Sequence, residues 1–269
     1  MVEDISAEWE KRSRLCGTSL QGVLLKGLPL TLNEHIHNWH SGFVVPTLPE
    51  DKESTILDVG CGFGRLSKAI KAHNPRAKLV GIDLSASYIE SYREITEGHG
   101  FVWAVEDYCD HLHNCDYIVC VTVLMYLDHV DVDRAVSNFN RYLNSNGCVI
   151  CIEPNRTGLK YQTLFGLIPL IRSISKKSGL NTGGRYFKPD EIESTFANNG
   201  FRLIRKERMP ATSIFLVPAA IVGKLFPKSI HLAIYSLLAY LDRLMKRTNL
   251  PSIYEAYVFE KISDSGSSR

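Results

Sequence analysis

The chain has no unbroken apolar run of about 18 residues, the length that marks a candidate membrane-spanning helix. Apolar residues nevertheless make up 45% of its 269 positions, and charged residues make up 22%. That composition is typical of a globular protein with a sizeable core. The first residues also lack a basic stretch followed by an apolar one, so we predict no secretory signal and expect a cytoplasmic protein.

Cysteine and histidine occur in two arrangements that could suggest a metal, and both fail on geometry. The seven cysteines show no regular framework, which favours reduced thiols. Cys148 and Cys151 lie in an apolar run expected to be a strand, where side chains three apart point to opposite faces. His35, His37 and His40 lie in an expected helix, on which only the last two share a face. Two ligands do not make a metal site, so we predict none.

Strand and helix patterns alternate along the chain from residue 54 onward. A helix is expected over 65–73, and Ser85 can cap a second one that reaches about residue 97. Asp131 is expected to cap a third, which Gly147 follows. Strands are expected at residues 55–59, 78–82, 101–105, 117–121, 148–152, 201–206 and 256–259.

This alternation predicts an α/β fold. The expected architecture is a Rossmann-like, seven-stranded, mostly parallel sheet with helices on both faces. Residues 1–45 are expected to form a helical N-terminal segment ahead of the sheet. No boundary for a second domain is visible, so we predict a single domain over 1–269 that ends in a disordered tail at 263–269.

A glycine-rich turn follows the first expected strand, with Gly60, Gly62 and Gly64 in a G-x-G-x-G spacing. Such a turn lets backbone N–H groups approach a ligand closely. A dinucleotide site instead requires G-x-G-x-x-G or a final alanine. Arg65 and Ser67 stand where that third small residue would be. The turn therefore indicates a nucleotide-type ligand other than a dinucleotide.

Two aspartates accompany this turn at the ends of consecutive strands. Asp58 precedes the first glycine by two residues, where it would repel a pyrophosphate but suit a cationic ligand. Asp83 ends the second strand, and a carboxylate there can accept hydrogen bonds from both hydroxyls of a ribose. The combination indicates S-adenosylmethionine, which carries a sulfonium, an ammonium and a ribose.

These residues resemble those of the class I S-adenosylmethionine-dependent methyltransferases, in particular the small-molecule branch (methyltransferase type 11) that includes ubiquinone-type enzymes. The resemblance covers about residues 54–208 and 255–262. It implies that Asp58 and the three glycines surround the methionine portion of the cofactor, and that Asp83 holds the ribose. It places the remaining cofactor contacts at Leu84, Asp107, Tyr108 and Val121.

Three residues beyond the fourth and fifth expected strands are candidates for a catalytic role: Tyr126, His129 and Glu153. Methyl transfer from a sulfonium is an in-line displacement, so positioning can supply much of the rate. An oxygen nucleophile of high pKa also benefits from a general base. Many relatives have histidines where this chain has Met125 and Tyr126, so the resemblance implies no specific acid–base residue.

Two insertions interrupt the expected core, at about residues 155–187 and 210–250. Residues 155–250 hold 16 Lys/Arg and 5 Asp/Glu, in a chain of net charge +2. We interpret the insertions as a helical lid over the site. Apolar residues flanked by Lys/Arg also favour contact with an anionic membrane and an apolar or lipid-linked acceptor. Nucleic acid is a less favoured partner, because the basic residues are interleaved with aliphatic ones.

The sequence therefore predicts a methyltransferase that acts on an oxygen of a small-molecule or lipid-linked acceptor, with peripheral membrane contact. Glu153-Pro154-Asn155 does not match the Pro-Pro-aromatic motif of adenine-N6 nucleic-acid methyltransferases. Two other functions stay open. An NAD(P)-dependent oxidoreductase would use a similar fold, although Asp58 and the missing third glycine argue against it. A module that binds S-adenosylmethionine without turnover would need no general base.

Overall fold

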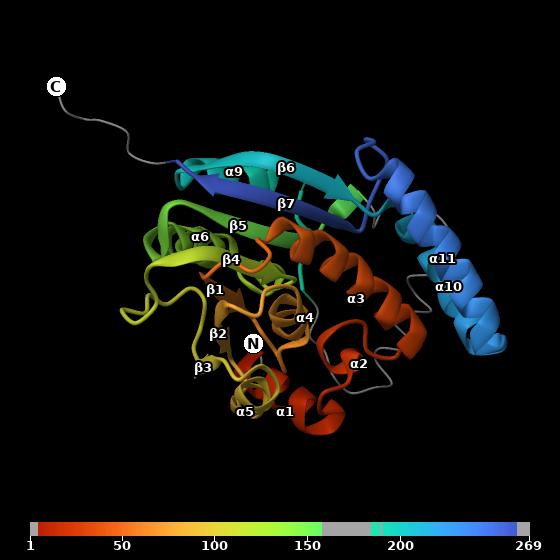
Figure 1. Ribbon diagram of the computed structural model, residues 1–269. Coiled ribbons are helices and arrows are strands. Elements are labelled where there is room, and N and C mark those ends of the chain that lie inside the picture. Colours follow the sequence, from red (N-terminus) through yellow and green to blue (C-terminus); the bar gives the residue numbers. More distant parts are fainter. Residues whose placement is uncertain (1–4, 158–183, 189, 263–269) are drawn as a thin grey trace.

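The computed structural model describes residues 5–157, 184–188 and 190–262, and these form a single seven-stranded sheet with helices on both faces. The strand order is β3-β2-β1-β4-β5-β7-β6 (Figure 1). Neighbouring strands from β3 to β5 pair in parallel, whereas β7 runs antiparallel to both β5 and β6. The Rossmann-like fold predicted from the alternating pattern is confirmed.

The strands lie close to their predicted positions, with two differences. The third begins and ends earlier than the predicted residues 101–105, and the fifth extends well before residue 148. The bounds are β1 Ser54–Val59, β2 Ala77–Asp83, β3 His99–Val102, β4 Cys115–Val121, β5 Leu143–Pro154, β6 Phe201–Arg208 and β7 Tyr254–Lys261.

The first two helices of the core begin where the sequence predicted. α4 (Arg65–His73) follows the glycine turn, and α5 (Ala86–Thr96) is capped by the Ser85 hydroxyl, which accepts the Tyr88 N–H. The predicted cap of α6 (His129–Tyr142) is wrong. Asp128, not Asp131, caps this helix, because its carboxylate accepts the N–H groups of the first turn, including that of Asp131 itself.

The remaining helices divide between the two faces of the sheet. One face packs on α4 and on the N-terminal α3 (Leu30–Val44), and the other packs on α6 and α9 (Glu191–Asn198). Cys148 belongs to the first of these cores and Cys151 to the second, as expected for side chains three apart on a strand. Two short helices precede α3: α1 (Ile5–Cys16) and α2 (Leu20–Val23). Two 3-10 turns complete the set, η1 (Val45–Thr47) and η2 (Leu124–Tyr126).

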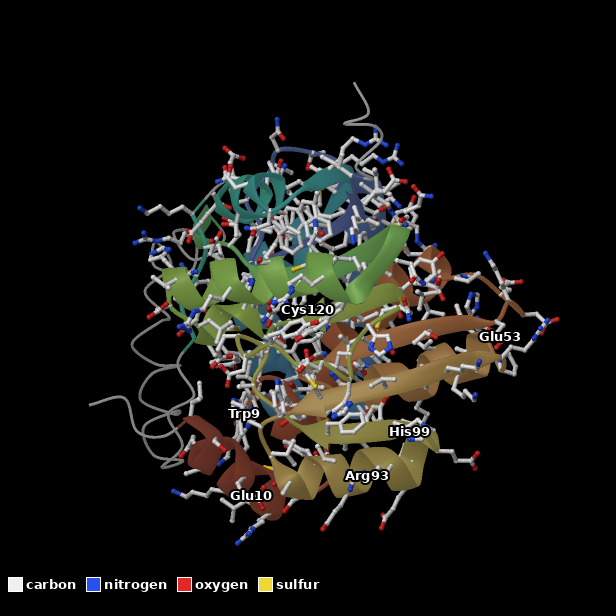
Figure 2. The ribbon with its side chains drawn as sticks, turned by 90° about the vertical axis from the view of Figure 1, so that its left-hand side faces the viewer. Trp9, Glu10, Glu53, Arg93, His99 and Cys120 are labelled. Carbon is white, nitrogen blue, oxygen red and sulfur yellow. The ribbon has the colours of Figure 1, made fainter. Side chains whose placement is uncertain are left out.

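The strand order reverses at β1: the chain adds β2 and β3 on one side of it, and β4 and the later strands on the other. In open α/β sheets ligands bind beside such a reversal, at the carboxyl ends of the strands. Figure 2 shows which end this is: Glu53 and His99, where strands begin, lie on one side, and Trp9 and Glu10 of α1 lie on the other. The N-terminal helix therefore sits at the edge where a ligand is expected.

The insertion at 210–250 forms two helices, α10 (Pro210–Leu225) and α11 (Lys228–Met245). They pack against each other and against α3, to one side of the sheet (Figure 1). Most of the other insertion, 158–183, and the predicted disordered tail at 263–269 lie outside the described residues. None of the described helices combines the length and apolar character needed to cross a bilayer.

Candidate active site

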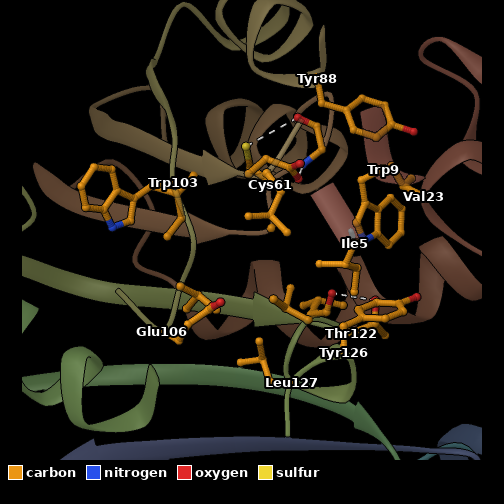
Figure 3. A pocket seen from close by; sticks show the side chains of 18 of the residues that line it. Ile5, Trp9, Val23, Cys61, Tyr88, Trp103, Glu106, Thr122, Tyr126 and Leu127 are labelled. Atoms are coloured by element: carbon orange, nitrogen blue, oxygen red, sulfur yellow. Dashed lines mark hydrogen bonds between the residues drawn. The ribbon is translucent and has the colours of Figure 1, made fainter. Parts of the chain in front are cut away.

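A pocket of about 830 Å³ opens at the carboxyl edge of the sheet, beside the reversal of strand order (Figure 3). Its lining comes from α1, α2, the glycine turn, the end of β2 and the segments after β3 and β4. Trp103 and Glu106 lie at one end, and Trp9, Val23 and Tyr88 lie at the other. That volume includes open solvent at the mouth of the pocket.

The glycine turn forms the floor of this pocket. Gly60 and Gly62 both line it, and both have left-handed backbone angles, with φ of +61° and +52°. A Cβ on Gly60 would overlap the Val123 side chain, and one on Gly62 would lie 2.9 Å from Val23. Gly64 has a different place: it caps α4 and does not line the pocket. Two of the three predicted glycines therefore face the ligand space.

Asp83 ties the end of β2 to the glycine turn. Its carboxylate accepts the Gly62 N–H at 2.9 Å through one oxygen and the Ser85 N–H at 2.9 Å through the other. Burial raises the pKa of Asp83 to about 6 despite these bonds. Each carboxylate oxygen has a second lone pair, so the group can still accept ribose hydroxyls. The structure thus places both Asp83 and the neighbouring Leu84 in the pocket.

Asp58 lies beneath the pocket rather than in it. Its carboxylate is buried, accepts the Ser67 hydroxyl at 2.7 Å and is absent from the pocket lining. Burial raises the pKa of Asp58 to about 6. The resemblance implied direct contact with the methionine portion, whereas the structure gives Asp58 an indirect part, because Ser67 on α4 takes its hydrogen bond.

Arg65, at the first turn of α4, supplies a half-buried cation that sequence reasoning did not assign to the site. Its guanidinium donates to Nδ1 of His37 at 3.1 Å and to Nδ1 of His40 at 3.3 Å. Burial lowers the pKa of His37 to about 4 and that of His40 further, so both rings are neutral and accept these bonds. His35 points elsewhere, to the Thr212 hydroxyl. Two of the three histidines considered as metal ligands therefore support this arginine.

The acid after β3 that faces the pocket is Glu106, which corrects the assignment to Asp107. β3 ends early, and a turn follows in which the Asp107 N–H bonds the Ala104 carbonyl, so the Asp107 side chain is exposed. Tyr108 also turns away: it stacks on Tyr142, with their ring centroids 5.6 Å apart. Val121, at the end of β4, does line the pocket as the resemblance implied.

Of the three catalytic candidates, only Tyr126 lines the pocket. Its ring meets Trp9 edge to face, with centroids 5.3 Å apart. The His129 side chain is 75% exposed, and its Nδ1 lies 3.1 Å from a Glu191 carboxylate oxygen. His129 starts α6 and does not line the described pocket.

Glu153 is the third candidate, and the structure gives it a positioning role. Its buried carboxylate accepts the N–H groups of Val123 at 2.9 Å, Leu124 at 2.8 Å and Met125 at 3.2 Å. Burial raises the pKa of Glu153 to about 8. These bonds hold the segment that follows Thr122. The φ of Thr122 itself is +58°, which is unusual for a β-branched residue. Glu153 thus shapes the wall that Thr122, Val123 and Tyr126 give to the pocket.

Cys120, Cys151 and Glu153 bring three potential ligand atoms within 4.8 Å of one another. The two cysteines are register partners on β4 and β5, and all three residues are buried. Burial raises the pKa of both thiols. Because metals bind the thiolate rather than the thiol, this environment favours core packing over ligation.

The N-terminal helix α1 closes one side of the pocket. Ile5 and Trp9 line the ligand space, and Glu10 fastens the helix to the start of α5. The Glu10 carboxylate accepts the Ser87 N–H at 3.2 Å, the Ser87 hydroxyl at 2.5 Å and the Ser85 hydroxyl at 2.8 Å. The Ser87 bond above all lowers the pKa of Glu10 to about 2. No local sequence signal indicated this contact.

We expect Glu10→Ala to weaken cofactor binding about fivefold to tenfold, because α1 loses its attachment and the pocket loses a wall. At roughly 1.4 kcal/mol per factor of ten, this is about 1 kcal/mol, the net contribution of a single hydrogen bond. Titration calorimetry would measure it, with Lys11→Ala, an exposed change on the same helix, as the control. Equal affinities of the two variants would show that the attachment does not matter for binding.

Comparison with known proteins agrees with this geometry. Residues 57–149 match the family described as "Methyltransferase domain". The chain is also 33% identical over 82 residues to a protein named ribosomal RNA small subunit methyltransferase C from Salmonella choleraesuis. That match covers 30% of this chain and 24% of the relative. The protein of the same name from Salmonella arizonae is 35% identical over 75 residues, or 28% and 22%. The chain thus matches only about a quarter of these relatives' length.

Solved structures share the fold over much longer stretches. The N-methyltransferase NodS from Bradyrhizobium japonicum, solved with S-adenosyl-L-homocysteine, matches with a TM-score of 0.56 over 94% of this chain and 98% of its own, at 11% identity. The cyclopropane synthase MmaA2 from Mycobacterium tuberculosis matches with a TM-score of 0.55 over 85% and 84%, at 14% identity. At these identities the likeness concerns the fold alone.

Proposed function

This chain carries a class I S-adenosylmethionine-dependent methyltransferase domain, and from that premise we propose that it methylates an oxygen of a small apolar or lipid-linked acceptor. S-adenosylmethionine is the cofactor of such a domain. The observation that supports the acceptor class is the division of the pocket lining. The charged lining residues, Arg65, Asp83 and Glu106, lie toward the glycine turn and the ends of β2 and β3, and the remaining wall is uncharged.

The charged part of the lining fits the cofactor. Asp83 can accept from the ribose hydroxyls, and Glu106 can accept from the adenine amino group at the Trp103 end of the pocket. Arg65, held by two neutral histidines, is suited to pair with the carboxylate of the methionine portion. The glycine turn allows the backbone approach that a Cβ would block. This set accounts for all three charges in the described lining.

The uncharged wall fits an apolar acceptor. Ile5 and Trp9 come from α1, Val23 comes from α2, and Tyr126 and Leu127 follow β4. None of these side chains carries a charge that could recognise a phosphate backbone. When bound, S-adenosylmethionine would supply its methyl group to the acceptor oxygen, whose proton would be released. Trp9 and Tyr126 would provide an uncharged wall against which the acceptor packs.

Three alternatives are less well supported. The relatives named as ribosomal RNA methyltransferases make an RNA acceptor the second candidate, but they match about 80 residues only. The aliphatic and aromatic wall beside α1 is unlike a basic nucleic-acid channel. An NAD(P)-dependent oxidoreductase is disfavoured by the match to a methyltransferase domain. A binding module without turnover would show affinity for the cofactor and transfer no methyl group.

Incubating the protein with methyl-labelled cofactor and fractionated cell extract tests the acceptor class. We expect label to enter the fraction extracted by organic solvent, and to be released by alkali where the acceptor oxygen belongs to a carboxyl group. The Asp83→Ala variant is the matched control, because it removes the ribose acceptor and leaves the uncharged wall intact. Label recovered in RNA would overturn the proposal, and no label in any fraction would favour the binding module.

We expect Tyr126→Phe to lower kcat about tenfold while leaving cofactor affinity unchanged. Tyr126 lines the pocket with its ring against Trp9, and the prediction is that its hydroxyl holds the acceptor hydroxyl by one hydrogen bond in the transition state. Loss of one such bond in the transition state corresponds to about 1.4 kcal/mol. Single-turnover kinetics would measure the step, with His129→Ala as a control outside the pocket. A Tyr126→Phe rate equal to that of the wild type would assign Tyr126 a packing role only.

A further inference from the structure

The helices α10 and α11 present an apolar outer surface that no described element covers. On α11, Ile230, Leu237, Tyr240 and Leu244 recur at helical spacing, and the last three are 57%, 58% and 63% exposed. Side chains three or four apart share one face of a helix. The outer face of α11 is therefore a continuous apolar stripe rather than a set of scattered residues.

α10 and its connection to α11 expose further apolar side chains. Phe215, Ile221 and Leu225 are exposed on this helix, and Phe226 is exposed in the connection to α11. We call these eight residues of α10, the connection and α11 the hairpin surface. Leu225 is the most exposed, at 73%. Exposed apolar side chains gathered on one helical hairpin are a mark of interaction sites.

The opposite face of α11 packs against the rest of the protein. The hairpin surface is therefore a second apolar face, distinct from the one that faces the core. His231, Tyr235, Leu238 and Asp242 are buried on that face. Tyr235 donates to the Ala219 carbonyl of α10, and its ring stacks with His35 of α3. The hairpin is thus anchored through its inner face, and its outer face is free to meet another surface.

The charged side chains that residues 210–250 themselves expose are of one sign. Asp242 is the only acid between residues 210 and 250. It is buried, and its carboxylate accepts the N–H groups of Ala211 and Thr212 at the start of α10. Lys228 at the start of α11 and Arg243 and Arg247 at its end are exposed. The outer surface therefore combines apolar side chains and cations with no exposed acid.

We propose that the hairpin surface docks on an anionic lipid surface, with its apolar side chains at the boundary of headgroups and acyl chains. Apolar helices flanked by Lys/Arg bind such interfaces through buried area and attraction to anionic headgroups. A second copy of this chain is the poorer occupant, because a symmetric contact would bring the same three cations together. The proposal goes beyond the proposed function, because the hairpin shares no described residue with the pocket lining.

Vesicle co-sedimentation of the full-length protein tests this docking. We expect binding to vesicles of phosphatidylglycerol and phosphatidylcholine at low salt, and much weaker binding to phosphatidylcholine alone. The double variant Leu237→Glu/Leu244→Glu should lose at least tenfold in partition. The matched control is Val130→Glu/Ile204→Glu, at 64% and 51% exposed positions on α6 and β6. This control should bind as the wild type does.

Removal of charge tests the lipid preference separately. Arg243→Gln and Arg247→Gln should each lower binding to the anionic vesicles about fivefold, the effect of roughly 1 kcal/mol per cation near the surface. Calorimetry with the cofactor should give wild-type affinity for every variant, which shows that they fold. Vesicle binding and methyl transfer are measured in separate experiments, so a failure of docking is distinguishable from a failure of the proposed methyl transfer.

Three results would overturn the proposal. The first is a wild-type protein that does not bind anionic vesicles at low salt. The second is a Leu237→Glu/Leu244→Glu variant that binds as the wild type does. The third is a wild-type protein that sediments as a dimer without vesicles while the Leu237→Glu/Leu244→Glu variant sediments as a monomer. A second copy of the chain would then occupy the hairpin surface.

Discussion

Glu153→Ala is expected to lower the free energy of unfolding by about 3 kcal/mol or more, since three N–H groups lose their acceptor at roughly 1–3 kcal/mol for each buried group. The donors are the N–H groups of Val123, Leu124 and Met125, and the carboxylate that accepts them is 1% exposed. The same segment carries Tyr126, so the pocket wall should loosen as well. Denaturant unfolding followed by circular dichroism would measure the change in stability.

Glu153→Gln separates positioning from acid–base catalysis. Its amide oxygen can still accept from Val123 and Leu124, which share one carboxylate oxygen in the structure, and only Met125 would face an N–H₂ group. We therefore expect an intermediate loss of stability and nearly normal turnover for each folded molecule. A general base would give the reverse pattern, with turnover lost and stability kept. That result would return Glu153 to the catalytic set.

Asp83→Ala is expected to weaken S-adenosylmethionine binding at least tenfold, or about 1.4 kcal/mol, through loss of the ribose bonds. The effect should exceed this minimum, because the same carboxylate accepts from Gly62 and Ser85 and so fixes the glycine turn. Asp107→Ala is the matched control: it removes a nearby acid whose side chain is exposed and outside the pocket. Equal affinities in calorimetry would contradict the assigned ribose site.

The affinity for the cofactor should also depend on pH through Asp83. Burial raises the pKa of Asp83 to about 6 from an ordinary value of 3.8, so the carboxyl is protonated below pH 6 before ligand binds. Only the ionised form accepts from both ribose hydroxyls. Affinity should therefore rise as the pH increases through about 6, and the rise should be smaller in Asp83→Ala. An identical pH profile in both proteins would exclude Asp83 as the titrating group.

The sequence alone determined the fold and the ligand class. Short apolar runs and helical spacings are local signals, so β1, α4 and α5 lie where the pattern put them. The glycine turn is equally local, because left-handed backbone angles at Gly60 and Gly62 follow from the residue type. Asp83 could be found because a strand end in a parallel sheet fixes its neighbourhood.

Only the tertiary structure decided which side chains reach the ligand space and what they do there. Glu106 replaces Asp107 because a turn after β3 sets the direction of the side chains, and nothing in the local pattern gives its phase. Glu153 is held by donors about 30 residues away in the chain, and Glu10 by serines more than 70 residues away. Likewise, the insertion at 210–250 was expected over the site and instead packs on α3. Such contacts depend on how segments distant in the chain pack together, and the local sequence pattern contains no information on that packing.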